Sequence, residues 1–323
     1  MRIVTVTAAG PAENLALTDA PVPDPAPGEV LIAVTASGVN RADLLQRQGF
    51  YPPPPGISDV IGLEVSGTIA ALGAGVSGWT VGDPCVALLA GGGYAEYVTV
   101  PAGQVIGLPA GVDLVSAAGL IEVAATVVSN FDHVRLGPGQ SVLVHGGAGG
   151  IGTFAIQYAT ALGARVLVTA GSPDKLQLCR DLGADVALDY HDAWPDGVRT
   201  ATDGRGVDVI LDVMGAKYLE DNLSCLAADG RLVVIGLQGG RKATLDLNQL
   251  LTKRATVTAT SLRFRPVEQK AAICAAVAER VWPLIASGAI RLAPETRFAA
   301  TDVVAAHARL ESGTNTGKIV LVW

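Results

Sequence analysis

The chain has 323 residues, half of them hydrophobic, with a net charge of −7 and an isoelectric point near 5.1. This length predicts about two domains with large cores, and the acidic balance argues against nucleic acid as a main partner. No apolar run approaches the roughly 18 to 20 residues that a membrane span needs, so we expect no contact with a membrane.

Two features indicate the compartment. The first expected strand, at residues 2–7, begins almost at the N-terminus and leaves no room for a signal peptide before it. The four cysteines lie far apart and form no C-x-x-C pair, which is typical of free thiols in a reducing environment. We therefore expect a cytoplasmic protein.

The first 120 residues alternate short apolar runs with proline and glycine. Short strands separated by such turn signals indicate a small β-barrel or sandwich. A short helix is expected at 40–48, with Asn40 as a possible N-cap. The segment 49–56, GFYPPPPG, should be an extended loop because proline fixes φ and removes a hydrogen-bond donor. Further strands are expected at 61–72, 84–89 and 94–100.

The stretch 141–172 carries the most specific signal. A buried strand at 141–145 is followed by Gly147-Ala148-Gly149-Gly150-Ile151-Gly152, which fits G-x-G-x-x-G, and then by a helical pattern and a second apolar strand at 165–169. In such a βαβ unit the glycines permit a tight turn, the approach of a pyrophosphate and helix-on-strand packing. The sequence therefore predicts a dinucleotide-binding site at the helix start.

The end of the second strand bears on the choice of cofactor. Sites for NAD usually carry an acid there, on the ribose 2′-hydroxyl, whereas this chain has Thr169-Ala170-Gly171-Ser172. Ser172 and Pro173 are good helix-start residues, and Lys175 follows in the first turn. A hydroxyl, a helix N-terminus and a lysine suit a 2′-phosphate, so NADPH is favoured over NADH, although Asp174 adds opposing charge.

The remaining chain continues the alternation. Helices are expected at 112–135, 173–182, 217–228, 271–287 and 301–312, and strands at 207–213, 231–235, 255–261 and 318–322. This spacing predicts a doubly wound parallel sheet. The last 55 or so residues show no further βαβ unit, so we expect them to return to the first domain.

Taken together, these residues resemble the medium-chain dehydrogenase/reductase superfamily, and within it the zinc-free NADPH:quinone oxidoreductases of the zeta-crystallin-like group. The segments that carry the resemblance include ASGVNRADLLQRQGFYPPPPG, IGLEVSGTI, AGGIG, VTAGSPDKL and the closing TGKIVL. The resemblance implies an α/β fold: a GroES-like, partly open β-barrel catalytic domain at 1–122 and 266–323, and a Rossmann NADPH-binding domain at 123–265.

No catalytic metal is expected. Zinc-dependent relatives carry Cys-His where this chain has Asn40-Arg41, and Gly-His-Glu where it has Gly62-Leu63-Glu64. Asparagine, arginine and leucine cannot replace the thiolate and imidazole ligands that zinc prefers. A quinone is already a strong hydride acceptor, so close positioning of the nicotinamide could supply most of the catalysis.

The resemblance also implies site residues. Tyr51 would donate a hydrogen bond to the developing oxyanion, unless it only packs on the proline loop, and Asn40 would approach the nicotinamide while also capping a helix. The roles of Glu64 and Glu122 stay unassigned. The cofactor residues implied are Thr126, Gly147, Ala148, Gly149, Gly150, Ile151, Gly171, Ser172, Lys175, Tyr190, Met214, Gly236, Leu237, Ser261, Leu262 and Lys318.

Three functions remain open. The first is an NADPH-dependent quinone reductase, and the second is a reductase of activated C=C bonds in enones or alkenals. The third is a non-catalytic protein that binds NADPH or nucleic acid, which the acidic charge disfavours. Family members pair along the last strand of the cofactor sheet, so a homodimer is expected near residues 256–261.

Overall fold

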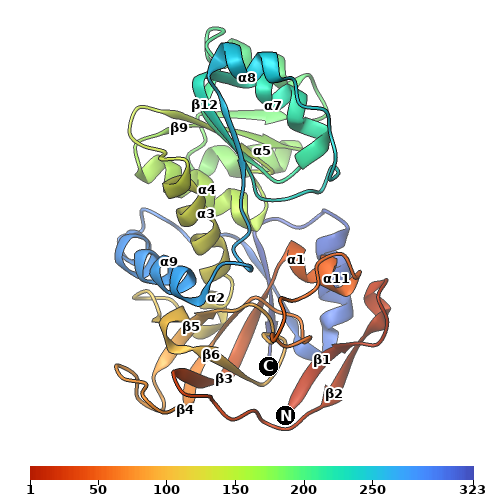
Figure 1. The fold of residues 1–323 in the computed structure, drawn as a ribbon, viewed down its shortest axis with the longest axis vertical. Helices are drawn as coiled ribbons and strands as arrows, with labels where there is room; N and C mark the ends of the chain where they lie inside the picture. Colours follow the sequence, from red (N-terminus) through yellow and green to blue (C-terminus); the bar gives the residue numbers. More distant parts are fainter. The chain divides into compact units, whose positions relative to one another are not determined.

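The computed structural model describes all 323 residues, and the chain divides into two compact units. Unit 1 comprises Met1–Ala125, Leu262–Gly288 and Leu292–Trp323, and unit 2 comprises Thr126–Ser261 and Ala289–Arg291. The chain thus builds unit 2 from one long continuous segment and the three residues Ala289–Arg291, and it otherwise returns to unit 1 after Ser261 (Figure 1).

Unit 2 is built on one six-stranded sheet in which every pair of neighbouring strands is parallel. Its order is β10-β9-β8-β11-β12-β13, which in the unit's own strand sequence is 3-2-1-4-5-6, the doubly wound topology. The central strands read as unbroken apolar runs because helices cover both faces of such a sheet. The strands are β8 (Ser141–His145), β9 (Arg165–Ala170), β10 (Val186–Asp189), β11 (Val207–Asp212), β12 (Leu226–Val234) and β13 (Thr256–Ala259).

The helices of unit 2 begin and end at identifiable caps. Ser172 accepts a hydrogen bond from the Lys175 backbone N–H at the start of α5, and Pro173 occupies the first turn, as predicted. At the C-terminal end of α7 (Leu219–Cys225), the Lys253 ammonium donates to three backbone carbonyls, each at 2.7 Å. The helices are α4 (Gly150–Ala161), α5 (Pro173–Asp181), α6 (Trp194–Ala201), α7 (Leu219–Cys225) and α8 (Leu247–Lys253), with the 3₁₀ turn η3 (Gly215–Tyr218).

Unit 1 is organised around β3, an 11-residue strand. One edge of β3 pairs with β4, and the other edge is shared by β6 and β15. Buried residues from β3, β4, β5, β6 and β7 form one core, so these five strands enclose a common interior. The strands are β1 (Arg2–Val6), β2 (Leu15–Asp19), β3 (Glu29–Val39), β4 (Glu64–Leu72), β5 (Pro84–Leu88), β6 (Tyr97–Pro101), β7 (Val105–Gly107), β14 (Glu295–Ala299) and β15 (Lys318–Val322).

The C-terminal segment corrects one expectation. The strands β14 and β15 are parallel and are joined through α11 (Val303–Glu311), so a further βαβ unit is present where the sequence predicted none. Its first strand, β14, is short and half-exposed, which weakens the periodic signal, whereas β15 is buried and was predicted as a strand. The segment does belong to unit 1, because β15 pairs antiparallel with β3.

The predicted helices at 112–135 and 271–287 are each divided in two. A turn separates α2 (Leu114–Ala117) from α3 (Ile121–His133), and Val281 separates α9 (Val267–Arg280) from α10 (Trp282–Ala286), where Pro283 starts a new first turn. The remaining helix of unit 1 is α1 (Arg41–Arg47), and short 3₁₀ turns are η1 (Ala12–Asn14), η2 (Ala102–Gln104) and η4 (Ala300–Asp302).

One stretch is more apolar than the sequence reading allowed. Leu114–His133 is long and apolar enough to cross a membrane by length and composition, with a hydropathy of 1.6. However, 78% of that window is buried within the protein, and a core helix meets the same criterion. Leu114–His133 is therefore a core segment of the protein, and its few polar residues, such as Ser116 and Glu122, leave its mean hydropathy high.

Candidate active site

The phosphate loop joins β8 to α4. Gly149 is the N-cap of α4, with φ −79° and ψ 173°, and its carbonyl accepts from the Thr153 N–H. The N–H groups at the start of α4 have no acceptors within the helix, so they and the helix dipole favour an anion at this end.

Two glycines of this loop are required for different reasons. A Cβ on Gly152 would lie 2.3 Å from the Gly146 carbonyl oxygen and 2.5 Å from the Gly147 Cα, which are backbone atoms that cannot move aside. A Cβ on Gly149 would meet nothing closer than 3.5 Å. Gly152 therefore serves packing within the protein, whereas at Gly149 the protein itself leaves room for a side chain.

Most of the expected cofactor residues lie at one edge of the unit 2 sheet. Because all six strands are parallel, their C-terminal ends share that edge, which is where open α/β sheets bind ligands. These residues are Gly147, Ala148, Gly149, Gly150 and Ile151 after β8; Gly171, Ser172 and Lys175 after β9; Tyr190 after β10; Met214 after β11; Gly236 and Leu237 after β12; and Ser261 after β13.

The turn after β9 is closely packed by a tyrosine. A Cβ on Gly171 would lie 2.1 Å from the Tyr190 hydroxyl, so the side chain of Tyr190 occupies the space that an acidic side chain at 171 would need. Beside it, Ser172 caps α5 through its hydroxyl, and Lys175 lies in the first helical turn. The structure therefore brings Gly171, Ser172, Lys175 and Tyr190 together.

After β11, a buried carboxylate shapes the loop. Asp212 is fully buried and accepts from the backbone N–H groups of Met214 and Gly215 at 2.7 and 2.9 Å. Burial raises the pKa of Asp212 to about 6, and the two N–H donors oppose that rise. Asp212 thus fixes the position at which Met214 leaves the strand.

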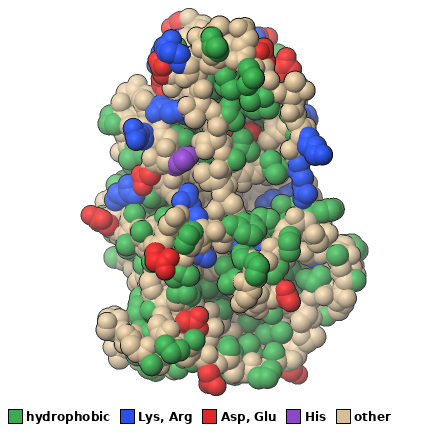
Figure 2. Space-filling view, viewed as in Figure 1, with side chains coloured by type: hydrophobic (Ala, Val, Ile, Leu, Met, Phe, Trp, Pro, Cys, Tyr) green, Lys and Arg blue, Asp and Glu red, His purple; other side chains and the backbone are tan.

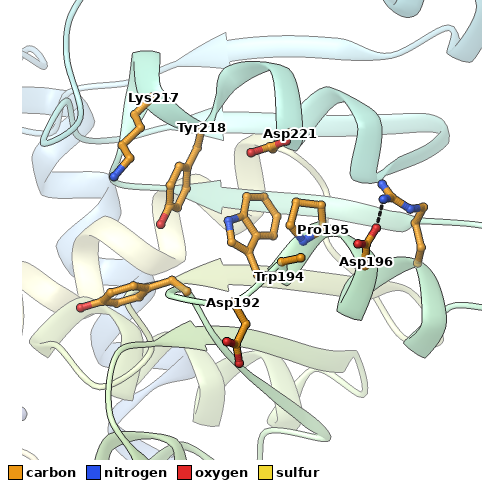
Figure 3. Close-up of a pocket in the computed structure, with 10 residues that line it drawn as sticks. Asp192, Trp194, Pro195, Asp196, Lys217, Tyr218 and Asp221 are labelled. Carbon is orange, nitrogen blue, oxygen red and sulfur yellow. Dashed lines mark hydrogen bonds and ion pairs between the residues drawn. The ribbon is translucent and has the colours of Figure 1, made fainter.

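A pocket of about 430 Å³ lies beside Tyr190, between the segment after β10 and the segment after β11 (Figure 3). The rings of Tyr190, Trp194 and Tyr218 line it, together with the Lys217 ammonium. Three aspartates also line it, of which Asp196 is paired with Arg199; the other two are Asp192 and Asp221. An anion would meet more carboxylates than cations here.

In unit 1, a buried ion pair ties Asn40 to the sheet. Lys318 lies 2.7 Å from Glu64 Oε1, and both side chains are almost fully buried. The Lys318 ammonium also donates to Asn40 Oδ1 at 2.7 Å and to the Val39 carbonyl at 3.3 Å, while Asn40 Nδ2 donates to Glu64 Oε1. All three ammonium protons therefore have acceptors within unit 1, which differs from the expected place of Lys318 beside a phosphate.

The second oxygen of Glu64 fixes the start of α3. Glu64 Oε2 accepts from the Glu122 backbone N–H at 2.9 Å. The Glu122 side chain is half-buried, and burial together with the nearby Glu64 charge raises its pKa to about 8. Burial is the larger of these two causes, and the Lys318 ammonium opposes the rise.

Tyr51 lies in the proline loop and is held by Arg263. The Arg263 guanidinium is 5.2 Å from the Tyr51 ring centroid and donates to the Tyr51 carbonyl, the Gln46 side chain and the Ala90 carbonyl. Phe264 packs edge-on against the same ring at 5.5 Å. Segment 49–56 forms no helix or strand, as predicted. The ring thus packs on Arg263 and Phe264 rather than on the prolines alone.

A second buried network lies behind Asn40. The Asp43 carboxylate accepts from the Asn40 N–H at 2.7 Å and from the Tyr94 hydroxyl at 3.2 Å, and Tyr94 in turn contacts His307. Burial raises the pKa of Asp43 to about 7 and lowers the pKa of His307 to about 3. The network fixes α1, and with it Asn40.

Within the structure, no group of three or more histidine, cysteine, aspartate or glutamate side chains is placed to hold a metal ion. Asn40 and Glu64, which stand where zinc-dependent relatives carry zinc ligands, do lie together, and their shared partner is the Lys318 ammonium. Glu64 Oε1 is therefore the partner of an ammonium in this structure.

Three further expected residues lie away from the strand ends of the unit 2 sheet: Thr126, Leu262 and Lys318, the last of which pairs with Glu64. Thr126 is the first residue of unit 2, within α3, and its carbonyl accepts from Asn130 Nδ2 at 2.7 Å. Leu262 is buried where the chain re-enters unit 1.

Two residues that line the pocket, Lys217 and Tyr218, were not predicted from the sequence, because no local motif connects them with Tyr190.

Sequence comparison matches two family models to this chain. The alcohol dehydrogenase GroES-like domain matches residues 26–110, and the zinc-binding dehydrogenase family matches residues 150–276. The quinone oxidoreductase of Pseudomonas aeruginosa is 32% identical over 99% of this chain and 98% of its own.

Solved structures agree with these matches. A mycobacterial protein complexed with NADPH is 36% identical, with a TM-score of 0.91 and full coverage of both chains. Escherichia coli quinone oxidoreductase complexed with NADPH is 27% identical, with a TM-score of 0.90 and full coverage of both chains. The expected fold class, a GroES-like domain with a Rossmann domain, is confirmed. The chain therefore belongs to the quinone oxidoreductase family of the medium-chain dehydrogenase/reductase superfamily, and it is an oxidoreductase.

Proposed function

We propose that this protein is an NADPH-dependent quinone oxidoreductase that transfers hydride directly to a quinone without a catalytic metal. The observation that carries the proposal is the set of loops at one edge of the unit 2 sheet, with an anion-binding helix start after β8 and a serine-lysine turn after β9. Two similar structures were solved with NADPH, which supports the same assignment.

Unit 2 would bind the cofactor and unit 1 the acceptor. The N–H groups of Gly150 and Ile151 would hold the pyrophosphate, whereas the Gly149 N–H already donates to the Gly146 carbonyl at 3.1 Å. Ser172, Lys175 and Tyr190 would hold the 2′-phosphate. The pocket beside Tyr190 is a poorer site for a phosphate, because three aspartates line it. When bound, NADPH supplies a hydride from nicotinamide C4.

In unit 1, Asn40 and Tyr51 would orient the acceptor and the nicotinamide. Asn40 is fixed by Lys318 and Glu64, and Tyr51 by Arg263, so neither has to be ordered when substrate binds. A hydrogen bond from Tyr51 to the developing oxyanion would stabilise the transition state. No zinc would be needed, because a quinone product anion is delocalised and requires no Lewis acid.

The decisive test is cofactor selectivity in a steady-state assay with a soluble naphthoquinone. Lys175→Ala should raise KM for NADPH by roughly tenfold, the value of one charge-assisted hydrogen bond, with KM for NADH unchanged. EDTA should leave the rates of NADPH oxidation and NADH oxidation unchanged.

Lys217→Ala is the matched control, because Lys217 lines the neighbouring pocket. Equal effects of Lys175→Ala on both cofactors, or a larger NADPH effect of Lys217→Ala, would contradict the phosphate assignment. Faster turnover of small enones than of naphthoquinones would favour reduction of activated C=C bonds instead. No NADPH oxidation with any acceptor would favour a non-catalytic binding protein.

We also propose that the protein is a cytoplasmic homodimer paired through β13. This strand is an edge of the unit 2 sheet, so its outer side is free of strand partners within the chain. Charges of both signs are dispersed over the face seen in Figure 2, so that face is not the continuous basic surface that nucleic acid would need.

A further inference from the structure

Two exposed aromatic side chains lie beside Tyr51. The chain has five phenylalanines, and only Phe50 and Phe264 are exposed, by 61% and 53%. Phe50 precedes Tyr51 in the chain, and Phe264 packs edge-on against the Tyr51 ring with the ring centroids 5.5 Å apart. Single exposed apolar residues are common on protein surfaces, whereas a group of them marks a binding surface.

Two aliphatic side chains extend this group. Ile57, 38% exposed, packs on Gly91, because a Cβ at position 91 would lie 3.0 Å from Ile57 Cγ2. Gly91 follows Ala90, whose carbonyl accepts from Arg263 Nε at 2.6 Å, so Ile57 lies on the same part of unit 1 as Phe264. Val267, 44% exposed, begins α9 shortly after Phe264. We call these four side chains the apolar rim: Phe50, Ile57, Phe264 and Val267.

Buried polar contacts hold the apolar rim in place. The Arg263 side chain is almost fully buried and donates to the Tyr51 carbonyl and to Gln46 Oε1. Gln46 Nε2 in turn donates to the Asp59 carbonyl at 2.9 Å, so both ends of the proline loop are fixed to α1. Proline restricts the backbone between them. A ligand that covers the rim would therefore order little of the protein, which favours binding.

Few charges interrupt the apolar rim. Asp59 is the only charged residue in 49–60, and only Arg265 and Glu268 flank Phe264 and Val267 outside the buried Arg263. Surfaces that bind membranes usually add clusters of lysine and arginine for anionic lipids. Small-molecule sites are instead mostly apolar with a few polar groups that fix orientation. The rim, with the Tyr51 hydroxyl beside it, has the composition of a small-molecule site.

We propose that the apolar rim binds an alkyl or prenyl side chain on the acceptor, so that the preferred substrates are quinones with an apolar tail. This inference rests on the proposed function, which puts the acceptor oxygen at Tyr51. A substituent on the same quinone ring lies over the residues that flank Tyr51. The tail contributes binding energy and takes no part in the transfer of hydride.

The test compares soluble quinones that share one dimethoxy-methyl-benzoquinone ring and carry no tail, one prenyl unit or a decyl chain. The full-length protein is assayed with NADPH at steady state. Wild-type kcat/KM should be roughly tenfold higher with the prenyl unit than without a tail, which is the effect of burying about two methylene groups. The decyl quinone should be at least as good a substrate as the prenyl quinone.

Phe264→Ala should lower the ratio of kcat/KM for the prenyl quinone to kcat/KM for the tail-free quinone by roughly threefold to fivefold, because a partly exposed ring contributes less than a buried one. The ratio cancels any loss that acts on both quinones through Tyr51. Phe264→Leu, which keeps an apolar side chain, should retain most of the preference.

Val81→Ala is the matched control. Val81 is 60% exposed in unit 1 but lies in the turn between β4 and β5, outside the apolar rim. It should keep the wild-type ratio. All three variants change exposed positions, so their melting temperatures should stay close to that of the wild type.

Several outcomes would overturn the inference. One is equal kcat/KM for the three quinones in the wild type; another is a ratio that Phe264→Ala does not lower. Sedimentation of the wild type with vesicles of phosphatidylcholine and phosphatidylglycerol, lost in Phe264→Ala, would assign the rim to a membrane instead. If the wild type reduces none of the quinones, the proposed function fails first, and that result is distinct from an enzyme that reduces all three equally well.

Discussion

The buried carboxylate of Glu64 connects several segments of unit 1. Glu64 accepts hydrogen bonds from Lys318, Asn40 and the Glu122 backbone, so both of its oxygens are used. Removing one member of a buried pair leaves an uncompensated charge, whereas exposed pairs contribute little. The consequences of substitution at this pair should therefore be large.

We predict that Lys318→Met lowers the free energy of unfolding by about 3 kcal/mol or more, because Glu64 stays buried without its cation. Urea denaturation at pH 7 measures the effect. Arg2→Ala, which breaks the partly exposed pair with Glu96, is the control and should cost less than about 1 kcal/mol. Adding Glu64→Gln should recover part of the loss. Similar midpoints for Lys318→Met and Arg2→Ala would contradict the prediction.

The phosphate loop illustrates what one element requires of its residues. Between β8 and α4 the chain turns so tightly that Gly152 packs against the backbone of Gly146 and Gly147. At Gly149 the protein leaves space, and the demand for glycine would come from the ligand. Stability and cofactor affinity should therefore be separable at this loop.

We predict that Gly152→Ala lowers both stability, by about 1–3 kcal/mol, and NADPH affinity. Gly149→Ala should leave the melting temperature almost unchanged, because its φ of −79° suits alanine, while weakening NADPH binding. Thermal melts and fluorescence titration with NADPH check both. Full NADPH affinity in Gly149→Ala would show that the pyrophosphate does not approach this backbone.

At the scale of the whole molecule, the unit 2 sheet ends in an exposed edge. On β13, the Thr260 N–H bonds inward to the Val234 carbonyl, so by alternation the Ala259 N–H points outward. Ala259 is exposed, and proline there would remove an outward donor while leaving the pairing with β12 intact.

We predict that the wild type is a dimer in size-exclusion chromatography with light scattering, and that Ala259→Pro is a monomer with an unchanged melting profile of each unit. Proline at an edge prevents strand pairing between copies. Val22→Pro, at an exposed position outside any strand of unit 1, is the control and should remain dimeric. A monomeric wild type, or a dimeric Ala259→Pro, would refute pairing through β13.

The sequence by itself determined the parts of this protein that depend on local physics. The phosphate loop, the Ser172-Pro173 start of α5 and the irregular 49–56 segment follow from glycine, cap and proline chemistry within a few residues. The doubly wound sheet follows from regular alternation of strands and helices. These features need no knowledge of distant contacts.

Only the tertiary structure decided the pairing of residues far apart in the chain. Lys318 joins Glu64 across 254 residues and Arg263 reaches Tyr51 across 212, and no periodicity encodes either contact. The parallel pairing of β14 with β15 was also missed, because β14 is a short, half-exposed strand that carries a weak local signal. The burial of a side chain and the charges around it depend on these distant contacts, so the raised pKa of Glu122 could not be predicted from the residues next to position 122 in the chain.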